Sequence, residues 1–389
     1  MKKLVAVLAP LAILVACACS STVTTANSTA APSGSPVNHS PSGGVATSET
    51  PPASPSSKVS GRSYGVLVDL ASPTTYYTVS VVGLDGRPWA QLRYDRRTPI
   101  AGTSGHAVQL PVVSASSTAL YMLNGDSAVE ELFLSDGHQI TVARLPVLPG
   151  QETAFAVSPD DSQMAYAVLD FNRKPVHVAL YTQTFNIQSP ARKIFESDTD
   201  YVWPVAWHGG LLVLAHAYGP YEESISKVAP ARDNPYSAVS YHVVDPSNAN
   251  RVVLMGACTV SGPLSPVGSA CIQGGTIDWN GATSPPWSTH DWGSISSAAS
   301  LSPDGSLVAA AEPGNPLWLG IWRPDGTIAL QMDTPDPHDW VGWIDRDHIL
   351  IGSETHSGWQ TRIVNVKDGS AVDVAAGGFY ATHLPTDIT

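Results

Sequence analysis

The chain has 389 residues, of which 33 are acidic and 20 are basic, so its net charge at pH 7 is −13. An acidic protein repels a phosphate backbone, which argues against nucleic acid as a partner. About 330 residues follow the first 60, and a segment of that length can bury a full hydrophobic core.

The first 16 residues have the pattern of an export signal. Lys2 and Lys3 precede an apolar run at residues 4–16, which is too short to span a bilayer comfortably as a mature helix. The run ends in Leu-Val-Ala-Cys, which resembles a bacterial lipobox. This resemblance implies cleavage before Cys17 and acylation of its thiol, so we expect a protein held by lipid at the extracytoplasmic face of the cell membrane. An ordinary secretory signal and a retained membrane helix are the alternatives.

Residues 17–60 are predicted to form a disordered tether. They are rich in Ser, Thr, Pro and Ala and contain almost no large apolar side chains, so they cannot bury enough surface to offset the entropy of ordering. A flexible coil of this length reaches roughly 35 Å. The tether has no polybasic patch, so the lipid on Cys17 must provide the membrane attachment.

Residues 61–389 are predicted to be all-β. From residue 63 onward, short apolar or alternating strands are separated by turns, and no stretch has a sustained helical period with caps. Asp-Gly between apolar runs is a strong hairpin signal because Gly supplies the positive φ that the turn needs. Such pairs begin at Asp85, Asp136, Asp304, Asp325 and Asp368.

The spacing of a second turn indicates a β-propeller. Ser158-Pro159-Asp160 and Ser302-Pro303-Asp304 each lie between two apolar strands, 144 residues apart, which is three steps of 48. A repeat of about 40 to 50 residues with four strands is typical of propeller blades. An apolar strand, Ser-Pro-Asp-Gly and a second apolar strand together resemble the TolB-like propeller repeat. The resemblance implies a fold and little about activity, because the repeat occurs in hydrolases, lyases and binding proteins.

Seven blades of four strands are expected, although six or eight remain open. The first segment, residues 64–94, has only three strands, and one strand at residues 379–384 is left over at the end. We predict that this last strand supplies the inner strand of blade 1 and closes the ring. Blades 2 to 7 are expected at residues 108–145, 154–196, 202–255, about 262–287, 297–332 and 340–374, with the fifth least regular.

Two cysteines are expected to form a disulfide. Cys258 and Cys271 are the only thiols in the predicted propeller, since Cys17 and Cys19 precede it. In an oxidising compartment they would close a short loop and stabilise the fold by roughly 3 kcal/mol. Two buried free thiols are the alternative. A metal role is disfavoured because no Cys or His lies at zinc-ligand spacing around either residue, and no metal or cofactor is expected.

One His-Asp pair recurs at the blade period. His290 and Asp291 are repeated 48 residues later as His338 and Asp339, and each pair is followed by Trp. Both pairs lie in connections that enter an inner strand, where they could act as an acid/base couple at the central funnel. The interpretation that we favour is structural: His and Asp bond to backbone groups in a tight loop. Trp207 and Trp343, at the ends of inner strands, are expected to pack in the core.

A long excursion in blade 4 is the best candidate for a binding surface. Residues 218–236 lie between the second and third strands, and long loops on rigid scaffolds often carry recognition. Tyr and Arg are also favoured at interface hot spots. A tolerated surface insertion is an equal alternative. The candidate contact residues are Tyr218, Tyr221, Glu222, Glu223, Arg232 and Tyr236.

Two functions follow from these patterns. The first is a lipid-anchored extracytoplasmic propeller that binds a protein or an envelope ligand and has no catalytic role. The alternative is an extracytoplasmic propeller enzyme, a hydrolase or a lyase, with its site near His290, Asp291, His338 and Asp339. The sequence does not identify the ligand and does not give the oligomeric state.

Overall fold

The computed structural model describes residues 63–70, 75–98, 110–185, 190–217, 240–254, 264–270, 276–282, 299–311, 318–333, 340–355 and 358–384. All of them belong to one compact unit, Pro52–Thr389, and the other unit, Met1–Pro51, lies outside the described residues. Within the described ranges the regular elements are all strands, and no helix there is long and apolar enough to cross a membrane.

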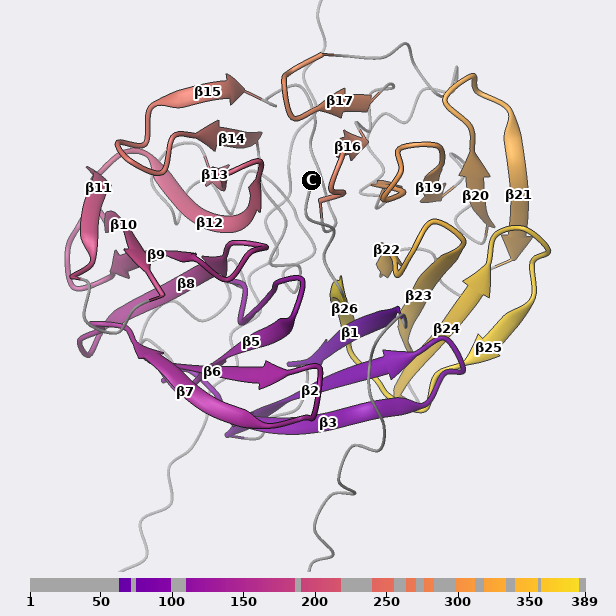
Figure 1. Ribbon diagram of the computed structural model, residues 1–389, viewed down its shortest axis with the longest axis horizontal. Coiled ribbons are helices and arrows are strands. Elements are labelled where there is room, and N and C mark those ends of the chain that lie inside the picture. Colours follow the sequence, from indigo (N-terminus) through magenta and orange to yellow (C-terminus); the bar gives the residue numbers. More distant parts are fainter. Residues whose placement is uncertain are drawn as a thin grey trace, which may run out of the picture. The chain divides into compact units, whose positions relative to one another are not determined.

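The strands form seven antiparallel sheets that surround a common centre, as Figure 1 shows. Six sheets have four strands and one has two within the described residues. The innermost strands contact one another from blade to blade, in the order β26, β4, β8, β12 on one side and β16, β18, β22, β26 on the other. Trp279 of blade 5 packs in the same core cluster as Trp207 of blade 4, which joins the two sides. This arrangement confirms the predicted seven-bladed propeller.

Blades 1 to 4 each have four described strands, ordered from the centre of the ring outward. Blade 1 contains β26 (Phe379–Leu384), β1 (Tyr64–Asp69), β2 (Tyr76–Gly83) and β3 (Pro88–Asp95). Blade 2 contains β4 (Val113–Ala115), β5 (Ala119–Asn124), β6 (Ala128–Phe133) and β7 (Gln139–Arg144). Blade 3 contains β8 (Gln151–Val157), β9 (Gln163–Asp170), β10 (His177–Thr184) and β11 (Arg192–Ser197). Blade 4 contains β12 (Tyr201–His208), β13 (Leu211–Ala217), β14 (Ser240–Val244) and β15 (Arg251–Leu254).

Blades 5 to 7 complete the ring. Blade 5 has two strands within the described residues, β16 (Gly268–Ala270) and β17 (Thr276–Asp278). Blade 6 contains β18 (Ala299–Leu301), β19 (Val308–Ala311), β20 (Trp318–Trp322) and β21 (Ile328–Asp333). Blade 7 contains β22 (Trp340–Trp343), β23 (His348–Thr355), β24 (Gly358–Asn365) and β25 (Ala371–Asp373).

The last described strand closes the ring, as predicted. β26 pairs antiparallel with β1, from Tyr64 opposite Leu384 to Val68 opposite Phe379, with a bulge after Val66. The chain therefore returns to its first blade and supplies the inner strand that the N-terminal segment lacks. Blade 1 thus joins strands from the beginning and the end of the described chain, and β26 pairs with the inner edge of β1.

Burial falls from the centre to the rim. The last five residues of β8 are all buried, as expected of a strand enclosed by two neighbouring blades. The outer strand β7 is exposed or half-buried throughout, and all three residues of β25 are exposed. The apolar side chains of the inner strands thus pack between blades, whereas the outer strands form the rim.

The two Ser-Pro-Asp turns are structurally equivalent. Ser158 Oγ donates to Asp160 Oδ1 at 2.7 Å, and Ser302 Oγ donates to Asp304 Oδ1 at 2.8 Å. In each turn the same carboxylate also accepts the backbone N–H two residues later, at 3.1 Å for Asp160 and 3.0 Å for Asp304. These bonds lower the pKa of Asp160. For Asp304 burial acts to raise the pKa, but the hydrogen bonds outweigh it and the pKa is lowered.

Candidate functional site

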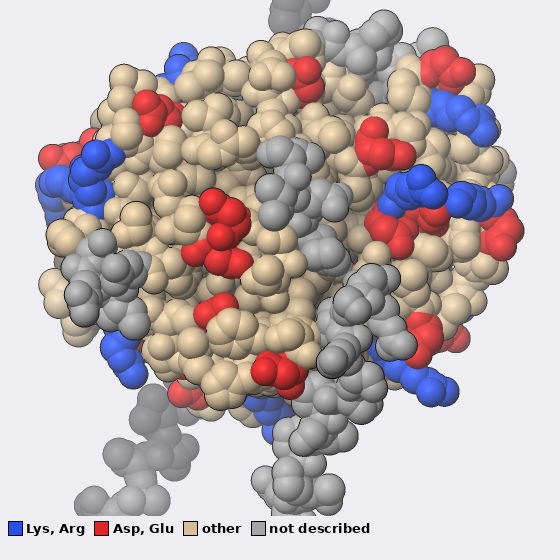
Figure 2. Space-filling model, in the orientation of Figure 1, with Lys and Arg blue, Asp and Glu red and all other residues tan. Residues whose placement is uncertain are grey.

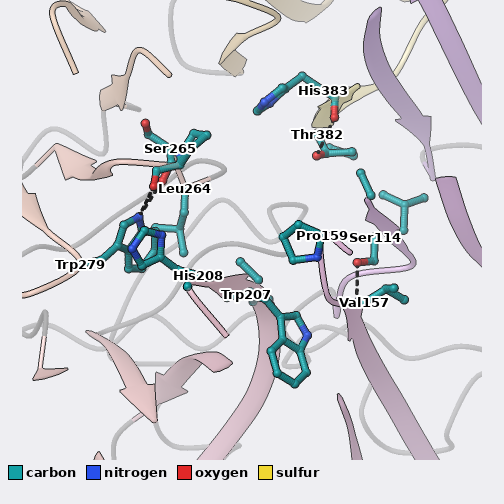
Figure 3. A pocket seen from close by; sticks show the side chains of 17 residues that line it. Ser114, Val157, Pro159, Trp207, His208, Leu264, Ser265, Trp279, Thr382 and His383 are labelled. Carbon is teal, nitrogen blue, oxygen red and sulfur yellow. Dashed lines mark hydrogen bonds between the residues drawn. The ribbon is translucent and has the colours of Figure 1, made fainter. Parts of the chain in front are cut away.

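The described residues form a cavity at one end of the central channel. Its lining comes from five blades and contains residues 381–383 of blade 1, 113–115 of blade 2, Val157 and Pro159 of blade 3, 205–209 of blade 4, and 264–266 with Trp279 of blade 5. Its cavity volume is about 100 Å³. We call it the channel-end cavity. Figure 3 shows its labelled side chains facing a common space.

Chain direction tells which end of the channel this is. The inner strands β8 and β12 reach the cavity with their last residues, just before the turn to the second strand of each blade. The predicted funnel residues His290, Asp291, His338 and Asp339 lie outside the described residues, and none of them is among the residues that line the cavity. The channel-end cavity is therefore a site that the sequence patterns do not indicate.

Aromatic rings form one wall of the channel-end cavity. The indole of Trp279 and the imidazole of His208 stack with centroids 5.2 Å apart and planes inclined by 22°. The Trp279 N–H donates to the carbonyl of Pro266 at 2.7 Å, which fixes the indole against the turn of blade 5. Trp207 contributes at the base, where its N–H donates to the carbonyl of Ala156 at 3.1 Å. Hydrogen bonds inside the protein thus hold this aromatic wall in place.

Several polar side chains of the cavity bond within the protein. Ser114 Oγ accepts the backbone N–H of Val157 at 2.9 Å, and Ser265 Oγ donates to the carbonyl of Ser302 at 2.8 Å. The hydroxyl of Tyr380 and Nδ1 of His383 lie 3.3 Å apart. The bonds of Ser114 and Ser265 join neighbouring blades, whereas the contact of Tyr380 with His383 lies within β26.

The channel-end cavity is uncharged. None of the described residues that line it is Asp, Glu, Lys or Arg. Burial lowers the pKa of His208, against the opposing effects of its hydrogen bond to the Pro266 backbone and of Asp278, so the ring is neutral at pH 7. On the face drawn in Figure 2, basic side chains lie toward the rim and acidic ones also occur nearer the middle.

A second polar cluster lies in blade 4, at the end of β13 and the start of β14. Nδ1 of His216 lies 3.4 Å from Ser240 Oγ, and Nε2 of His216 lies 3.7 Å from Asp200 Oδ1. The ring of His216 also stacks on that of His242 at 4.6 Å. The order Ser, His, Asp is that of a nucleophilic triad. Ser240 is however fully buried. Its hydroxyl also lies 3.5 Å from Nε2 of His242, so it bridges the two histidines.

Burial governs the protonation of these histidines. It lowers the pKa of His216, against the opposing charge of Asp200. It also lowers the pKa of His242 to about 4, and repulsion from His216 and Arg251 adds to the effect. Both rings are therefore neutral at pH 7. No group of three or more His, Cys, Asp or Glu among the described residues is arranged to hold a metal ion.

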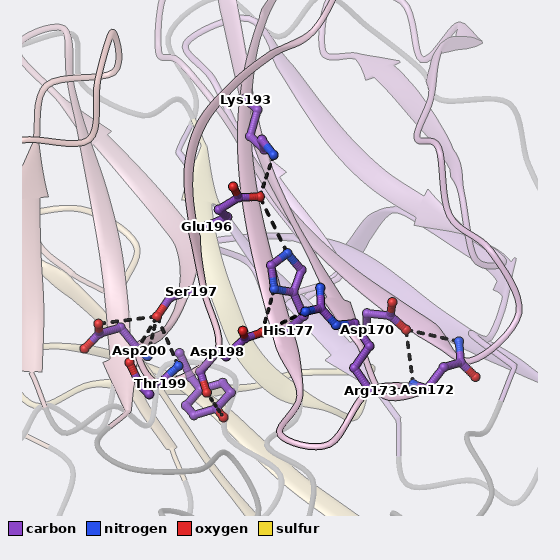
Figure 4. Close-up of polar contacts among 11 residues, drawn as sticks. Asp170, Asn172, Arg173, His177, Lys193, Glu196, Ser197, Asp198, Thr199 and Asp200 are labelled. Atoms are coloured by element: carbon purple, nitrogen blue, oxygen red, sulfur yellow. Dashed lines mark hydrogen bonds and ion pairs between the residues drawn. The ribbon is translucent and has the colours of Figure 1, made fainter.

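A third group of charges lies on the rim of blade 3, and Figure 4 shows its contacts. Nδ1 of His177 lies 2.8 Å from Asp198, which also pairs with Arg173 at 3.4 Å. Nε2 of His177 lies 3.7 Å from Glu196, which pairs with Lys193. Ion pairs this exposed contribute about 0–1 kcal/mol each, and the group is explained as a solvated network on an outer sheet.

All of the sequence-predicted site residues lie outside the described residues. This holds for the lipidation site Cys17 and the disulfide pair Cys258 and Cys271. It holds for the funnel candidates His290, Asp291, His338 and Asp339. It also holds for the candidate binding residues Tyr218, Tyr221, Glu222, Glu223, Arg232 and Tyr236. These assignments stay predictions.

Two further sequence features acquire a structural meaning. Trp207 and Trp343 are buried, as expected, and Trp207 also lines the channel-end cavity. Ser265-Pro266 does not match the Ser-Pro-Asp pattern, because Val267 occupies the position of Asp. The carbonyl of Ser265 nevertheless accepts the indole N–H of Trp279, and its hydroxyl donates to the carbonyl of Ser302.

No family model and no curated protein matches the chain. Among solved structures, it is similar to a europium-containing methanol dehydrogenase, at 10% identity and a TM-score of 0.44, with 84% of this chain and 81% of that one covered. A protein from Lactobacillus plantarum gives 10% identity and a TM-score of 0.44, with 83% and 98% covered. An oligogalacturonate lyase in complex with manganese gives 12% identity and a TM-score of 0.35, with 77% and 70% covered. At these identities, function has to be argued from the residues of this chain.

Proposed function

We propose that the chain is a lipid-anchored extracytoplasmic propeller that binds a protein or envelope ligand through its channel-end cavity and does not catalyse a reaction. The observation that carries this proposal is the composition of the cavity. Five blades converge on a concave space with aromatic and aliphatic walls and a few polar groups, which is the general make-up of a ligand site. An acid/base site instead needs titratable groups poised around the reacting atoms.

The N-terminal segment supports a role in display. Lipid on Cys17 fixes one end of the chain at the membrane, and a tether of residues 17–60 gives the propeller a reach of roughly 35 Å. A binding domain held this way can contact partners in the envelope while it remains attached. Residues 218–236 offer a second contact region in the same proposal.

Anchoring is tested by fractionation of cells that express the full chain. The wild type is expected in the membrane fraction and in the detergent phase, and Cys17→Ala is expected to leave both. Cys19→Ala is the matched control, since Cys19 is two positions from the proposed acylation site and is expected to have no effect. Retention of Cys17→Ala in the membrane fraction would show that another segment anchors the chain.

Binding is tested by site-specific photo-crosslinking on the anchored chain. A photoreactive amino acid in place of Leu264 lies in the cavity, whereas one at position 138 lies in the exposed turn between β6 and β7. An adduct that forms at position 264 and not at position 138 supports the cavity as the binding site. The enzyme alternative would replace the proposal if neither position gave an adduct and the chain released products from envelope polysaccharide or peptide. His290→Ala should then abolish that release.

A further inference from the structure

The stacked pair of Trp279 and His208 forms a fixed face of the channel-end cavity. Trp279 follows β17, in a turn where Asp278 Oδ1 accepts the backbone N–H groups of Asn280 at 2.9 Å and Ala282 at 2.8 Å. The indole N–H is bonded to the carbonyl of Pro266. His208 ends β12 and stacks on the indole. The stack covers part of each ring and Trp279 is only 4% exposed, so the two rings form a packed aromatic wall that needs little reordering when a ligand binds.

The wall across the cavity is aliphatic. In Figure 3, Pro159 and Ser114 lie on the side of the cavity opposite Trp279 and His208. Val157, which comes from the same strand end as Pro159, also lines the space. A flat group that enters the cavity thus meets aromatic rings on one side and aliphatic side chains on the other.

The charges and hydrogen bonds of the cavity restrict what can occupy it. An ion would lose its hydration without gaining a counter-charge, because the described lining residues include no Asp, Glu, Lys or Arg. A ligand rich in hydroxyl groups would need a partner for each of them. The hydroxyl of Ser265 and the indole N–H of Trp279 already donate inside the protein, and Ser114 Oγ already accepts one backbone N–H. An uncharged ring with few polar atoms loses the least on entering such a site.

We propose that the channel-end cavity takes an uncharged aromatic ring, which inserts between the face of Trp279 and His208 and the wall of Val157 and Pro159. This inference rests on the proposed binding function and specifies the class of ligand. The ring belongs either to a free aromatic compound or to a Tyr or Trp side chain of a partner polypeptide, since both present the same chemistry. Offset or edge-to-face contact with Trp279 provides the attraction.

The test uses ligand-observed NMR on the purified full chain with probes that differ in charge. N-acetyl-tyrosinamide is neutral, tyramine is cationic and 4-hydroxyphenylacetate is anionic, while all three have the same phenol ring. We expect the neutral probe to bind at least five-fold more tightly than either charged one. Maltose serves as a neutral ligand rich in hydroxyl groups and is expected not to bind. Equal binding of the three phenols, or binding of maltose alone, would overturn the inference.

Variants place the signal in the cavity. His208→Ala removes part of the aromatic face, and Ala206→Phe fills the space with a ring of the protein itself; each is expected to reduce binding of the neutral probe at least five-fold. His138→Ala is the matched control, because His138 also stacks on an aromatic ring, that of Phe133, but lies in the exposed turn of blade 2. Equal loss in His138→Ala, or no loss in both cavity variants, would overturn the inference.

Two further comparisons identify the source of the ring and distinguish a failure of this inference from a failure of the proposed binding function. If acetyl-Gly-Tyr-Gly-amide binds ten-fold more tightly than N-acetyl-tyrosinamide, the ring belongs to a partner polypeptide. Equal affinity of the two probes supports a free aromatic compound. A crosslink at position 264 without binding of any phenol would overturn the ligand class and leave the binding function standing. The absence of both would overturn the two together.

Discussion

The indole N–H of Trp343 donates to the backbone carbonyl of Ser300 at 3.0 Å, and this bond joins the inner strand of blade 7 to that of blade 6. Trp207 makes the same bond to Ala156, from blade 4 to blade 3. Ser300 and Ala156 each lie two residues before the Ser of a Ser-Pro-Asp turn. The repeat thus includes an indole that fastens one blade to the one before it, in addition to the turn.

Loss of this bond is expected to destabilise the ring. Trp343→Phe removes the N–H and leaves a buried carbonyl without its donor, which costs about 1–3 kcal/mol in addition to the smaller ring. Trp203→Phe is the matched control, because Trp203 is fully buried and its N–H has no hydrogen-bond partner among the described residues. We expect the free energy of unfolding, from denaturant titration, to fall by about 1–2 kcal/mol more in Trp343→Phe. An equal loss in both variants would mean that the bond contributes nothing.

Asp161 gives a second test of the contacts between blades. It has a φ of 57°, in the left-handed region where the equivalent turn of blade 6 has Gly305. Glycine relieves backbone strain there by about 1 kcal/mol. The carboxylate however accepts the hydroxyls of Tyr121 at 2.7 Å and Thr118 at 2.6 Å, both from blade 2.

We therefore expect Asp161→Gly to destabilise the protein by about 1–2 kcal/mol, because two hydrogen bonds to a charged group outweigh the relief of strain. A double-mutant cycle with Tyr121→Phe should give a coupling energy of about 1 kcal/mol. A more stable Asp161→Gly variant would show that backbone strain is the larger effect.

The stacked histidines of blade 4 predict a pH dependence. Burial lowers the pKa of His216 and His242 in the folded chain, to about 4 for His242. Between the unfolded value near 6.5 and this lower value, the unfolded chain binds protons that the folded chain does not. Their contribution to stability is thus complete above about pH 6.5 and is lost as the pH falls toward 4.

His242→Phe keeps an aromatic ring against His216 and removes one titrating group. We expect the melting temperature of the wild type to fall by roughly 2–4 °C more than that of His242→Phe between pH 7 and pH 4.5, after allowance for partial exposure of the ring. His138→Phe, which replaces an exposed imidazole, should follow the wild type. Parallel curves for wild type and His242→Phe would refute the assignment.

The fold was predictable from the sequence because its signals are local and repeated. The turns at Ser158 and Ser302 define the blade period, and the surplus strand at residues 379–384 fits only as the missing inner strand of blade 1. The channel-end cavity was not predictable in the same way. Five blades that are far apart in the sequence form it, and residues such as Ser114 and His208 follow no pattern that marks them before the ring is closed.

The predicted disulfide can be tested without further structural information. Cys258→Ser is expected to lower the free energy of unfolding of the oxidised protein by about 3 kcal/mol, as the chain-entropy estimate gives for a loop of this length. Under strong reductant, the wild type and the variant should differ by much less. With Cys17 acylated, Cys19 accounts for one free thiol, so three free thiols in the oxidised wild type, counted by thiol titration after denaturation, would contradict the pairing with Cys271.

The seam of the ring depends on a glycine. A Cβ atom at Gly342 in β22 would lie 2.0 Å from the ring of Tyr380, and that ring belongs to the closing strand β26 and is buried. The hydroxyl of Tyr380 also donates to the carbonyl of Trp343. Gly342→Ala is therefore expected to push β26 away from blade 7 and to destabilise the protein by about 3 kcal/mol, at the upper end of the usual cost of overpacking.

Gly352→Ala in the neighbouring strand β23 is the matched control, because its added Cβ would meet its nearest atom at an ordinary 3.4 Å. Hydrogen exchange should be faster in β26 and β1 of Gly342→Ala and unchanged in Gly352→Ala. Equal stability of the two variants would show that the closing strand does not need this close contact.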